Sequence, residues 1–201
     1  PPNTSGLSTA ISLTSAQTQI RKTGTSSVKT REAGIRRYAI TSQSAVIDAG
    51  AITPVVWQVR TGVWAGASAC QAPITSQWFV GATADITSKG SLNLVNSGLG
   101  KALVQVSVFS ENGALTPRDL VVQANSYKQI SLPSLAPGAK SIAIHIEAKS
   151  GRVNGFLVDE RGKGLRSLGG DIVNSTDDAG KNLQIPAIPQ QVKKKTPSPH
   201  T

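Results

Sequence analysis

The chain has 201 residues, of which 38% are hydrophobic, and it carries a formal net charge of +10 at pH 7. This length accommodates one large or two small soluble domains with packed cores. No apolar run approaches the roughly 20 residues that a membrane-spanning helix requires, so the sequence excludes such a helix. Methionine is absent even from position 1, which predicts a mature product or an excised segment in which no signal peptide can be read.

The positive charge is concentrated outside the main body of the chain. Six basic residues lie between Arg21 and Arg37, and three more lie at 193–195. Twelve basic and ten acidic residues remain in 38–190, so the body is nearly neutral. Nucleic-acid-binding proteins usually cluster basic residues among stacking aromatics on a folded face, and only 4% of this chain is aromatic. The distribution argues against nucleic acid and favours a solvated basic loop and tail, or one attracted to an anionic envelope surface.

The first third of the chain is the less clearly patterned part. Residues 1–6 are Pro, Asn, Thr, Ser and Gly, so we expect a disordered N-terminus. Residues 7–70 are predicted to form a first β-sandwich module, abbreviated or incomplete because its strands before Tyr38 are poorly patterned. Cys70 is the only cysteine and cannot form an intrachain disulfide. We interpret it as a buried, inert thiol, with the unpaired half of a bridge to an upstream segment as the alternative.

Residues 76–173 show a stronger β pattern, in which short apolar alternations are separated by turns. Asn96-Ser97-Gly98 and Glu111-Asn112-Gly113 predict turns on either side of the alternating run at 103–109, because Asn and Gly tolerate positive φ. No amphipathic helix of about ten or more residues is expected. The predicted strands lie around Leu92 and Leu94 and at 103–109, 120–123, 128–132, 141–146 and 153–159.

The order of these signals occurs twice. The stretch 46–69 reads as strand, turn, strand, glycine turn, strand, and 130–158 repeats that order. We therefore predict an all-β fold, an immunoglobulin-like antiparallel β-sandwich in two tandem modules joined by 71–75. Residues 174–201 should form an extended, largely disordered basic tail, since lysine and proline accumulate there.

Candidate catalytic groups are few. His200 lies in the predicted tail, and His145 occupies an alternating position opposite isoleucines, which predicts a solvent-facing strand residue. Cys70 is far from His145 in the sequence, so a Cys-His pair would be accidental. The chain has neither a phosphate-loop motif nor histidine or cysteine residues at metal-ligand spacing. The sequence therefore predicts no enzyme activity, no catalytic residue, no cofactor and no metal centre.

Acidic and basic residues near the end of the second module could bind a ligand. Asp159-Glu160 and Asp177-Asp178 are adjacent pairs, and adjacent strand residues point to opposite faces, so neither makes a glycosidase dyad by itself. A calcium site in 159–178 is an alternative, although the dense acidic spacing of a known calcium loop is missing. The basic, glycine-rich loop at 161–166 could contact a phosphate or sulfate on a glycan, or be a simple surface turn.

The three tryptophans could offer stacking faces for sugars. Trp57 lies between apolar neighbours and Trp78 precedes Phe79, so core packing is the favoured interpretation for each tryptophan. Six residues remain as candidate ligand-binding residues: Trp64, Trp78, Asp159, Arg161, Lys163 and Arg166.

Several short motifs resemble those of the DUF5719 family, chiefly over residues 70–173. They are Cys70 with Pro73, Gln77-Trp78-Phe79-Val80-Gly81, Leu92-Asn93-Leu94-Val95-Asn96, Val104 to Phe109 with Asn112-Gly113, Leu135-Ala136-Pro137-Gly138, and Gly151-Arg152-Val153 leading to Asp159 and Gly164-Leu165. A weaker match lies upstream and at Ile185-Pro186-Ala187-Ile188-Pro189. The family comprises secreted or envelope-associated actinobacterial proteins of unknown function. The resemblance implies export and brings no catalytic residue with it.

These features together predict a non-enzymatic extracytoplasmic protein with a structural, adhesive or interaction role in the bacterial cell envelope. The alternative is a carbohydrate-binding or accessory module of an envelope polysaccharide system. The expected partner is accordingly a cell-wall glycan or another envelope protein, and the expected location is secreted or associated with the cell envelope. The sequence leaves the oligomeric state open.

Overall fold

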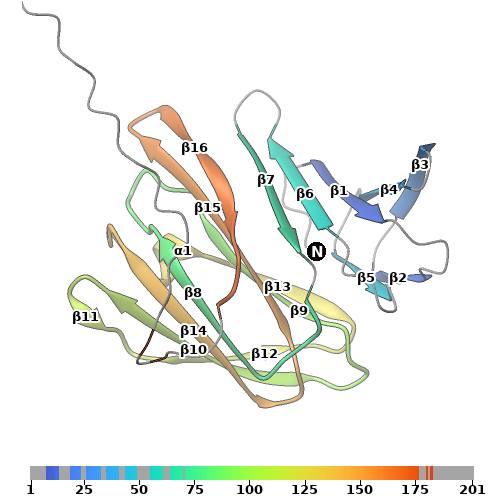
Figure 1. Cartoon of the computed structure of the whole chain (residues 1–201). Coiled ribbons are helices and arrows are strands. Elements are labelled where there is room, and N and C mark those ends of the chain that lie inside the picture. Colours follow the sequence, from blue (N-terminus) through green and yellow to red (C-terminus); the bar gives the residue numbers. More distant parts are fainter. Residues whose placement is uncertain are drawn as a thin grey trace, which may run out of the picture.

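The computed structural model describes residues 71–176, Gly180 and Asn182, together with the backbones of seven strands upstream of residue 71 and the side chains at 64–68. Within 71–176 the chain is built almost entirely of antiparallel strands (Figure 1). The strands are β8 (Ser76–Ala82), β9 (Ser91–Asn96), β10 (Ala102–Ser110), β11 (Gly113–Ala114), β12 (Arg118–Val122), β13 (Ser126–Ser131), β14 (Ile142–Ser150), β15 (Asn154–Lys163) and β16 (Arg166–Val173), with one helical turn, α1 (Leu132–Leu135).

These strands form two sheets. The first, which we call the β10 sheet, has the order β11-β10-β14-β8, and β12 also pairs with β10. The second, the β9 sheet, has the order β13-β9-β15-β16. The chain crosses between the sheets as it passes from β8 to β9 to β10, and again from β13 to β14 to β15. This arrangement confirms the predicted all-β antiparallel β-sandwich.

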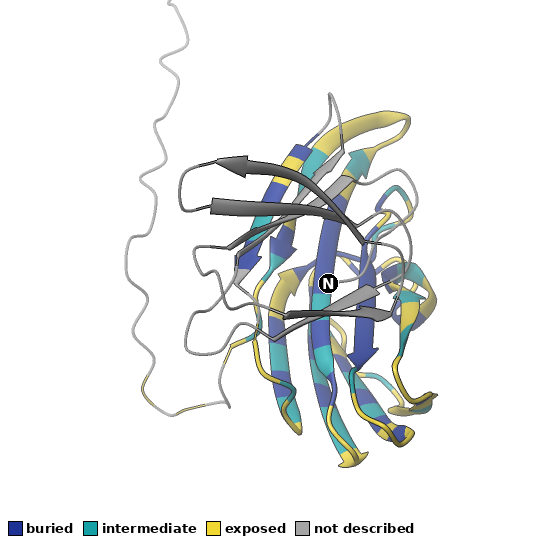
Figure 2. Cartoon of the chain, turned by 90° about the vertical axis from the view of Figure 1, so that its right-hand side faces the viewer, coloured by how far each residue is buried: buried dark blue, intermediate teal, exposed yellow. Residues whose placement is uncertain are grey.

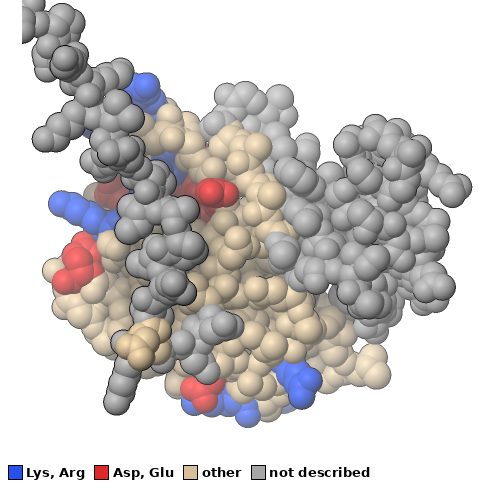
Figure 3. Space-filling model, in the orientation of Figure 1, with Lys and Arg blue, Asp and Glu red and all other residues tan. Residues whose placement is uncertain are grey.

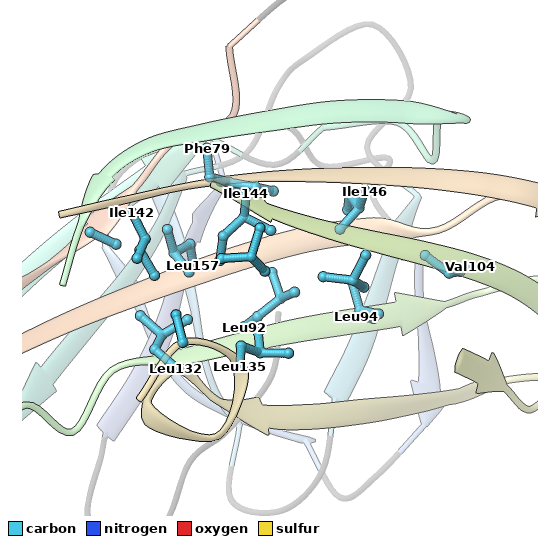
Figure 4. Close-up of a cluster of buried hydrophobic side chains, with 14 of the residues drawn as sticks. Phe79, Leu92, Leu94, Val104, Leu132, Leu135, Ile142, Ile144, Ile146 and Leu157 are labelled. Atoms are coloured by element: carbon cyan, nitrogen blue, oxygen red, sulfur yellow. The ribbon is translucent and has the colours of Figure 1, made fainter. Parts of the chain in front are cut away.

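The core lies between the two sheets and follows from strict alternation of apolar residues. In β10, Ala102, Val104, Val106 and Val108 are buried while the residues between them are not. Figure 4 shows side chains of β14, β10 and Phe79 on one side of the core meeting side chains of β9, β15 and α1 on the other. The labelled core residues are Phe79, Leu92, Leu94, Val104, Leu132, Leu135, Ile142, Ile144, Ile146 and Leu157.

The predicted turn after β10 is also present. Ser110 pairs with Gly113 and Phe109 with Ala114, so the chain reverses within two residues. Gly113 has φ +111°, a conformation that a side chain would make costly. The sequence signal at Glu111-Asn112-Gly113 therefore predicted this reversal for the correct physical reason.

Strand β9 is buried on both faces over its whole length. Leu92 and Leu94 point into the core, and the alternate residues Asn93 and Val95 are also almost fully buried. The β9 sheet therefore does not present an open, solvated outer face along this strand, in contrast to the β10 sheet.

Upstream strands form a five-stranded sheet of order β3-β4-β1-β6-β7 and a two-stranded sheet of β2 and β5. Their bounds are β1 (Ser8–Leu13), β2 (Gln19–Thr23), β3 (Ser26–Glu32), β4 (Ile35–Ile40), β5 (Ser44–Asp48), β6 (Val55–Arg60) and β7 (Trp64–Ala69). Strand β7 lies against β16: Ser68 Oγ donates to Asn174 Oδ1 at 2.6 Å, and Gly66 lies close to Asp171 and Ile172. The division into two tandem immunoglobulin-like modules, the module boundaries and the internal repeat stay predictions.

Beyond β16 the chain returns to the other sheet. Ser175 Oγ donates to Gln71 Oε1 at 2.5 Å, and Thr176 N donates to Trp78 O at 2.8 Å. Several predictions concern residues outside the described part of the chain, namely those on the N-terminal residues 1–6, the side chain of Trp57, Cys70, Asp177-Asp178, His200 and most of the C-terminal tail.

Candidate functional site

Trp78 lies on the outer face of the β10 sheet rather than in the core. It is half-buried, whereas the next residue, Phe79, is 1% exposed and packs between the sheets. Adjacent strand residues point to opposite faces, so only one of the two can enter the core. The expectation of core packing for Trp78 was therefore wrong. Because Trp78 is adjacent to Phe79 in the strand, its side chain points to the face of the sheet opposite the core.

The indole of Trp78 belongs to a stack of three rings. The ring of His145 lies 4.4 Å away with an interplanar angle of 17°, and that of Phe109 lies 5.6 Å away at 25°. The register brings them together, because β14 pairs with both β8 and β10. The prediction that His145 faces away from the isoleucines is confirmed, and its ring is half-buried against Trp78.

Large apolar side chains extend this stack along the outer face. Val80 is 59% exposed and Phe109 is 37% exposed. Each is the register partner of Ala143 on β14, which lies between them in the sheet. Leu103 and Val121 are exposed to a similar degree and pair with each other on β10 and β12. This pair lies at the opposite end of β10 from Phe109, with Gln105 and Ser107 between them. We call the outer surface formed by Trp78, Val80, Phe109 and His145 the aromatic face.

Polar side chains border the aromatic face on the same strands. Ser76 Oγ and His145 Nε2 are 2.9 Å apart, and Gln105 Nε2 donates to Asp119 Oδ1 at 3.2 Å. Glu147 accepts a hydrogen bond from Lys149 Nζ at 2.7 Å, and this bond lowers the pKa of the Glu147 carboxyl. The border therefore offers hydrogen-bonding groups and an ionised carboxylate beside exposed rings.

The structure places Trp64 in a different environment. Its side chain is 8% exposed and lies against Gly170 of β16, where an added Cβ would be only 2.9 Å from Trp64 Cε2. The expected packing of Trp64 in the protein interior is confirmed. Among the described residues its buried Nε1 has no hydrogen-bond partner, and the indole contributes contact area against β16.

Asp159 and Arg161 are brought together as a structural pair. Asp159 is 5% exposed; Arg161 Nε donates to its Oδ2 at 2.7 Å, and Thr83 N donates to its Oδ1 at 3.2 Å. Arg161 Nη2 also donates to Gly81 O at 2.8 Å. These bonds join β15 to the end of β8 and to the residue that follows it, and they engage both carboxylate oxygens of Asp159. The neighbouring Glu160 is also buried, which the sequence analysis did not anticipate.

Lys163 and Arg166 pair with each other at the tip of the β15–β16 hairpin, where both are exposed. They share this end of the sandwich with Arg161, but Trp78 lies on the opposite sheet. The six candidate residues therefore do not form one site.

Neither a metal-ligand cluster nor a membrane-spanning helix occurs among the described residues. Within the part of the chain that the structure describes, His, Cys, Asp and Glu residues do not gather in threes as a metal site would need. Among the same residues, no helix has the length and apolar character to cross a membrane.

Val80 and Phe109 were not predicted from the sequence as surface residues. Alternation carried a signal, because Phe109 has the same parity as the outward-facing Gln105 and Ser107. Their assembly with Trp78 depends on the pairing of β14 between β8 and β10, which the sequence pattern alone does not specify.

Comparison with known proteins identifies one relationship. Comparison with curated proteins and with solved structures finds no match. The model of a family of unknown function, DUF5719, matches residues 12–198. That match covers nearly the whole chain, including the upstream strands from the end of β1 onward and the described sandwich. The chain therefore belongs to the DUF5719 family.

Proposed function

We propose that this protein is a non-enzymatic, extracytoplasmic binding protein with a structural, adhesive or interaction role in the bacterial cell envelope, and that the aromatic face is its contact surface. The observation that carries the proposal is the exposure of Val80 and Phe109 on one outer sheet face, beside the stacked rings of Trp78 and His145. Single exposed apolar residues are common on soluble proteins, whereas a contiguous apolar patch marks an interaction site.

The carboxylates of the sandwich support a binding rather than a catalytic role. Asp159 is held by Arg161 and Thr83, so its oxygens are engaged in structural hydrogen bonds. Hydrogen bonds lower the pKa of Glu111 and of Glu147. A general acid working near neutral pH requires the opposite shift.

The geometry of the ring stack bears on the kind of partner. His145 lies nearly parallel to Trp78 at 4.4 Å and covers one face of the indole, so that face is closed to a sugar ring. Val80 and Phe109 project from the same surface and suit an apolar partner surface. An envelope protein is therefore the proposed partner.

Carbohydrate binding is the second candidate. It is favoured by the hydrogen-bonding side chains that share the outer sheet face with the exposed Phe109 ring, on β10, β12 and β14, including Gln105, Asp119 and Glu147. Sugar sites typically combine an aromatic surface with a few oriented polar groups. The polar border of the aromatic face provides both elements.

Sedimentation of the full chain with bacterial envelope particles tests the proposal. The double variant Val80→Ser, Phe109→Ser should lose at least about tenfold in affinity, since two apolar contacts disappear. Leu99→Ser is the matched control, because Leu99 is 96% exposed and lies in the turn before β10, at the opposite end of that strand from Phe109. Equal binding of the double variant and the wild type would refute the role of this face.

Protease treatment of the particles separates the two partners. Binding to untreated particles that disappears after proteolysis supports an envelope protein. Binding that persists on protein-free cell-wall glycan, and that the double variant loses, supports the carbohydrate alternative instead.

A further inference from the structure

The β15–β16 hairpin ends in a strongly exposed leucine. Leu165 has a relative exposure of 109%, the highest among the exposed large hydrophobic residues of the described chain. The preceding Gly164 adopts φ +58°, which lets the chain reverse between Lys163 and Arg166. Figure 1 shows the hairpin extending past the ends of the neighbouring strands, and Figure 2 shows exposed residues at its tip.

A second apolar residue is exposed beside this hairpin. Ile86, on the segment between β8 and β9, is 87% exposed. The next residue, Thr87, donates from Oγ1 to Gly162 O at 2.6 Å, and its carbonyl lies so close to Gly162 that a side chain there would clash. The segment carrying Ile86 is therefore packed on the base of the hairpin that carries Leu165.

Leu168 adds a third apolar side chain. The register between β15 and β16 shifts near Arg161 and Gly162, which leaves Leu168 unpaired beside Gly169, whose φ is +106°. Such a bulge inserts an extra residue and redirects its side chain. Leu168 is 58% exposed as a result.

Basic side chains surround these apolar residues. Lys163 and Arg166 are exposed at the tip, and Lys89 is exposed where its backbone N–H donates to Glu160 O at 2.9 Å. Asp85 is the acidic residue nearest Ile86 in the sequence, and its carboxylate accepts from Ile86 N at 2.7 Å. Figure 3 shows basic side chains at the end of the molecule where Figure 1 places the hairpin. We call this end of the sandwich, formed by Ile86, Lys89, Lys163, Leu165, Arg166 and Leu168, the basic tip.

We infer that the basic tip is a peripheral membrane-binding site, which inserts Leu165 and Ile86 into the surface of a bilayer that contains anionic lipids. Exposed apolar side chains gain free energy when they enter the boundary between headgroups and acyl chains. Lysine and arginine beside them are attracted by the negative potential of such a surface.

The apolar residues distinguish a bilayer from other anionic partners. A sulfated glycan or a free phosphate would engage Lys163 and Arg166 but would leave Leu165 in water. A bilayer satisfies both kinds of residue at once. This inference does not rest on the proposed envelope partner, because the basic tip lies at the end of the β9 sheet and the aromatic face lies on the β10 sheet.

Flotation with lipid vesicles tests the inference on the full chain. The protein should float with vesicles of phosphatidylcholine and phosphatidylglycerol, and much less with phosphatidylcholine alone. Leu165→Ser should weaken binding by about tenfold, because one leucine side chain no longer enters the bilayer. Leu165→Trp should restore it, since tryptophan is favoured at the membrane interface.

Matched variants at the opposite end of the sandwich provide the controls. Leu99→Ser should leave vesicle binding unchanged, although Leu99 is 96% exposed. Replacing Lys163 and Arg166 by Gln should weaken binding by about fivefold for each charge, and replacing Lys101 and Arg152 by Gln should have a smaller effect. The unfolding temperature of each variant should match the wild type, because these side chains are exposed.

Three outcomes would overturn the inference. The first is that the wild type fails to float with anionic vesicles. The second is that Leu165→Ser binds as well as Leu99→Ser. The third is that both pairs of Gln replacements weaken binding equally. The second result, combined with competition by soluble glycerophosphate, would identify headgroup phosphate recognition without insertion.

Discussion

Trp78 of β8 and His145 of β14 stack on the outer face of the β10 sheet, with ring centroids 4.4 Å apart and planes inclined by 17°. They are direct partners in the strand register, so the pairing of β8 with β14 fixes the contact. Ser76 Oγ lies 2.9 Å from His145 Nε2 and holds the imidazole in position. An outward-facing tryptophan is therefore ordered by its neighbours before any partner binds.

This stack should contribute to stability as well as to binding. We expect Trp78→Ala to lower the free energy of unfolding by about 2 kcal/mol, because the half-buried indole loses contact with two rings. A double-mutant cycle with His145→Ala should give a coupling energy of about 0.5–1.5 kcal/mol. Urea denaturation measures both values. Val80→Ala is the control, since Val80 is 59% exposed and should cost much less; additive effects of Trp78→Ala and His145→Ala would contradict the coupling.

The buried carboxylate of Asp159 should matter more than an ion pair at the surface. Asp159→Ala leaves Thr83 N without its acceptor and removes the carboxylate that holds the Arg161 side chain, so we expect a loss of about 1–3 kcal/mol in unfolding free energy. Lys149→Ala breaks the Glu147–Lys149 pair, whose side chains are 42% and 44% exposed, and should change stability by less than about 1 kcal/mol. Chemical denaturation compares the two, and equal losses would show that burial of Asp159 carries no energetic weight.

Gly155 is required by the packing of the core. A Cβ at this position would lie 2.6 Å from Ile146 Cδ1 and 2.9 Å from Phe79 Cζ, with Gln77 Oε1 also in contact. Gly155→Ala should therefore destabilise the protein by about 1–3 kcal/mol. At Gly100 an added Cβ meets nothing within 4 Å, so Gly100→Ala is the matched control and should be close to neutral. Thermal unfolding of the two variants distinguishes steric conflict from a general effect of replacing glycine.

Glu111 should make stability depend on pH. Its carboxylate accepts hydrogen bonds from Lys140 N at 2.9 Å and Ser141 N at 3.2 Å, and the bond from Lys140 is the main cause that lowers the pKa of Glu111 from its ordinary value of 4.5. A pKa that is lower in the folded state adds stability above the unfolded-state value, and this contribution is lost as the pH falls through the folded-state value. Glu111→Gln should therefore lower the unfolding temperature at neutral pH, with the difference from wild type shrinking in acid. A difference that stays constant from neutral to acidic pH would contradict this linkage.

Alternation made much of the sandwich predictable. The run from Leu103 to Phe109 reads as a strand and lies within β10, because a strand with one face in the core must place apolar residues at every second position. The run after Ser141 succeeded for the same reason, and it also placed His145 on the outer side correctly. Near Leu132 the prediction extended the strand too far, since Pro133 instead stands in the first turn of α1.

The candidate site was predicted less well, because it depends on which strands become neighbours. Trp78 was expected in the core on account of Phe79, although alternation separates the two residues onto opposite faces. Asp159 was considered as a ligand, but its partner Thr83 comes from a distant segment that the sequence pattern does not connect to β15. Contacts between segments far apart in the chain require the strand order, and local patterns do not encode it.

The hydrogen bond from Thr176 N to Trp78 O has a consequence for how the chain behaves when it is cut. Strand β8 is the last strand of its sheet, and an unprotected strand at that position can pair with another molecule. The segment after β16 lies along this strand and takes up one of its carbonyl groups. Proteolysis between Val173 and Thr176 would uncover the rim of the sheet next to the exposed rings, so the cleaved protein should self-associate through strand pairing more than the intact protein does.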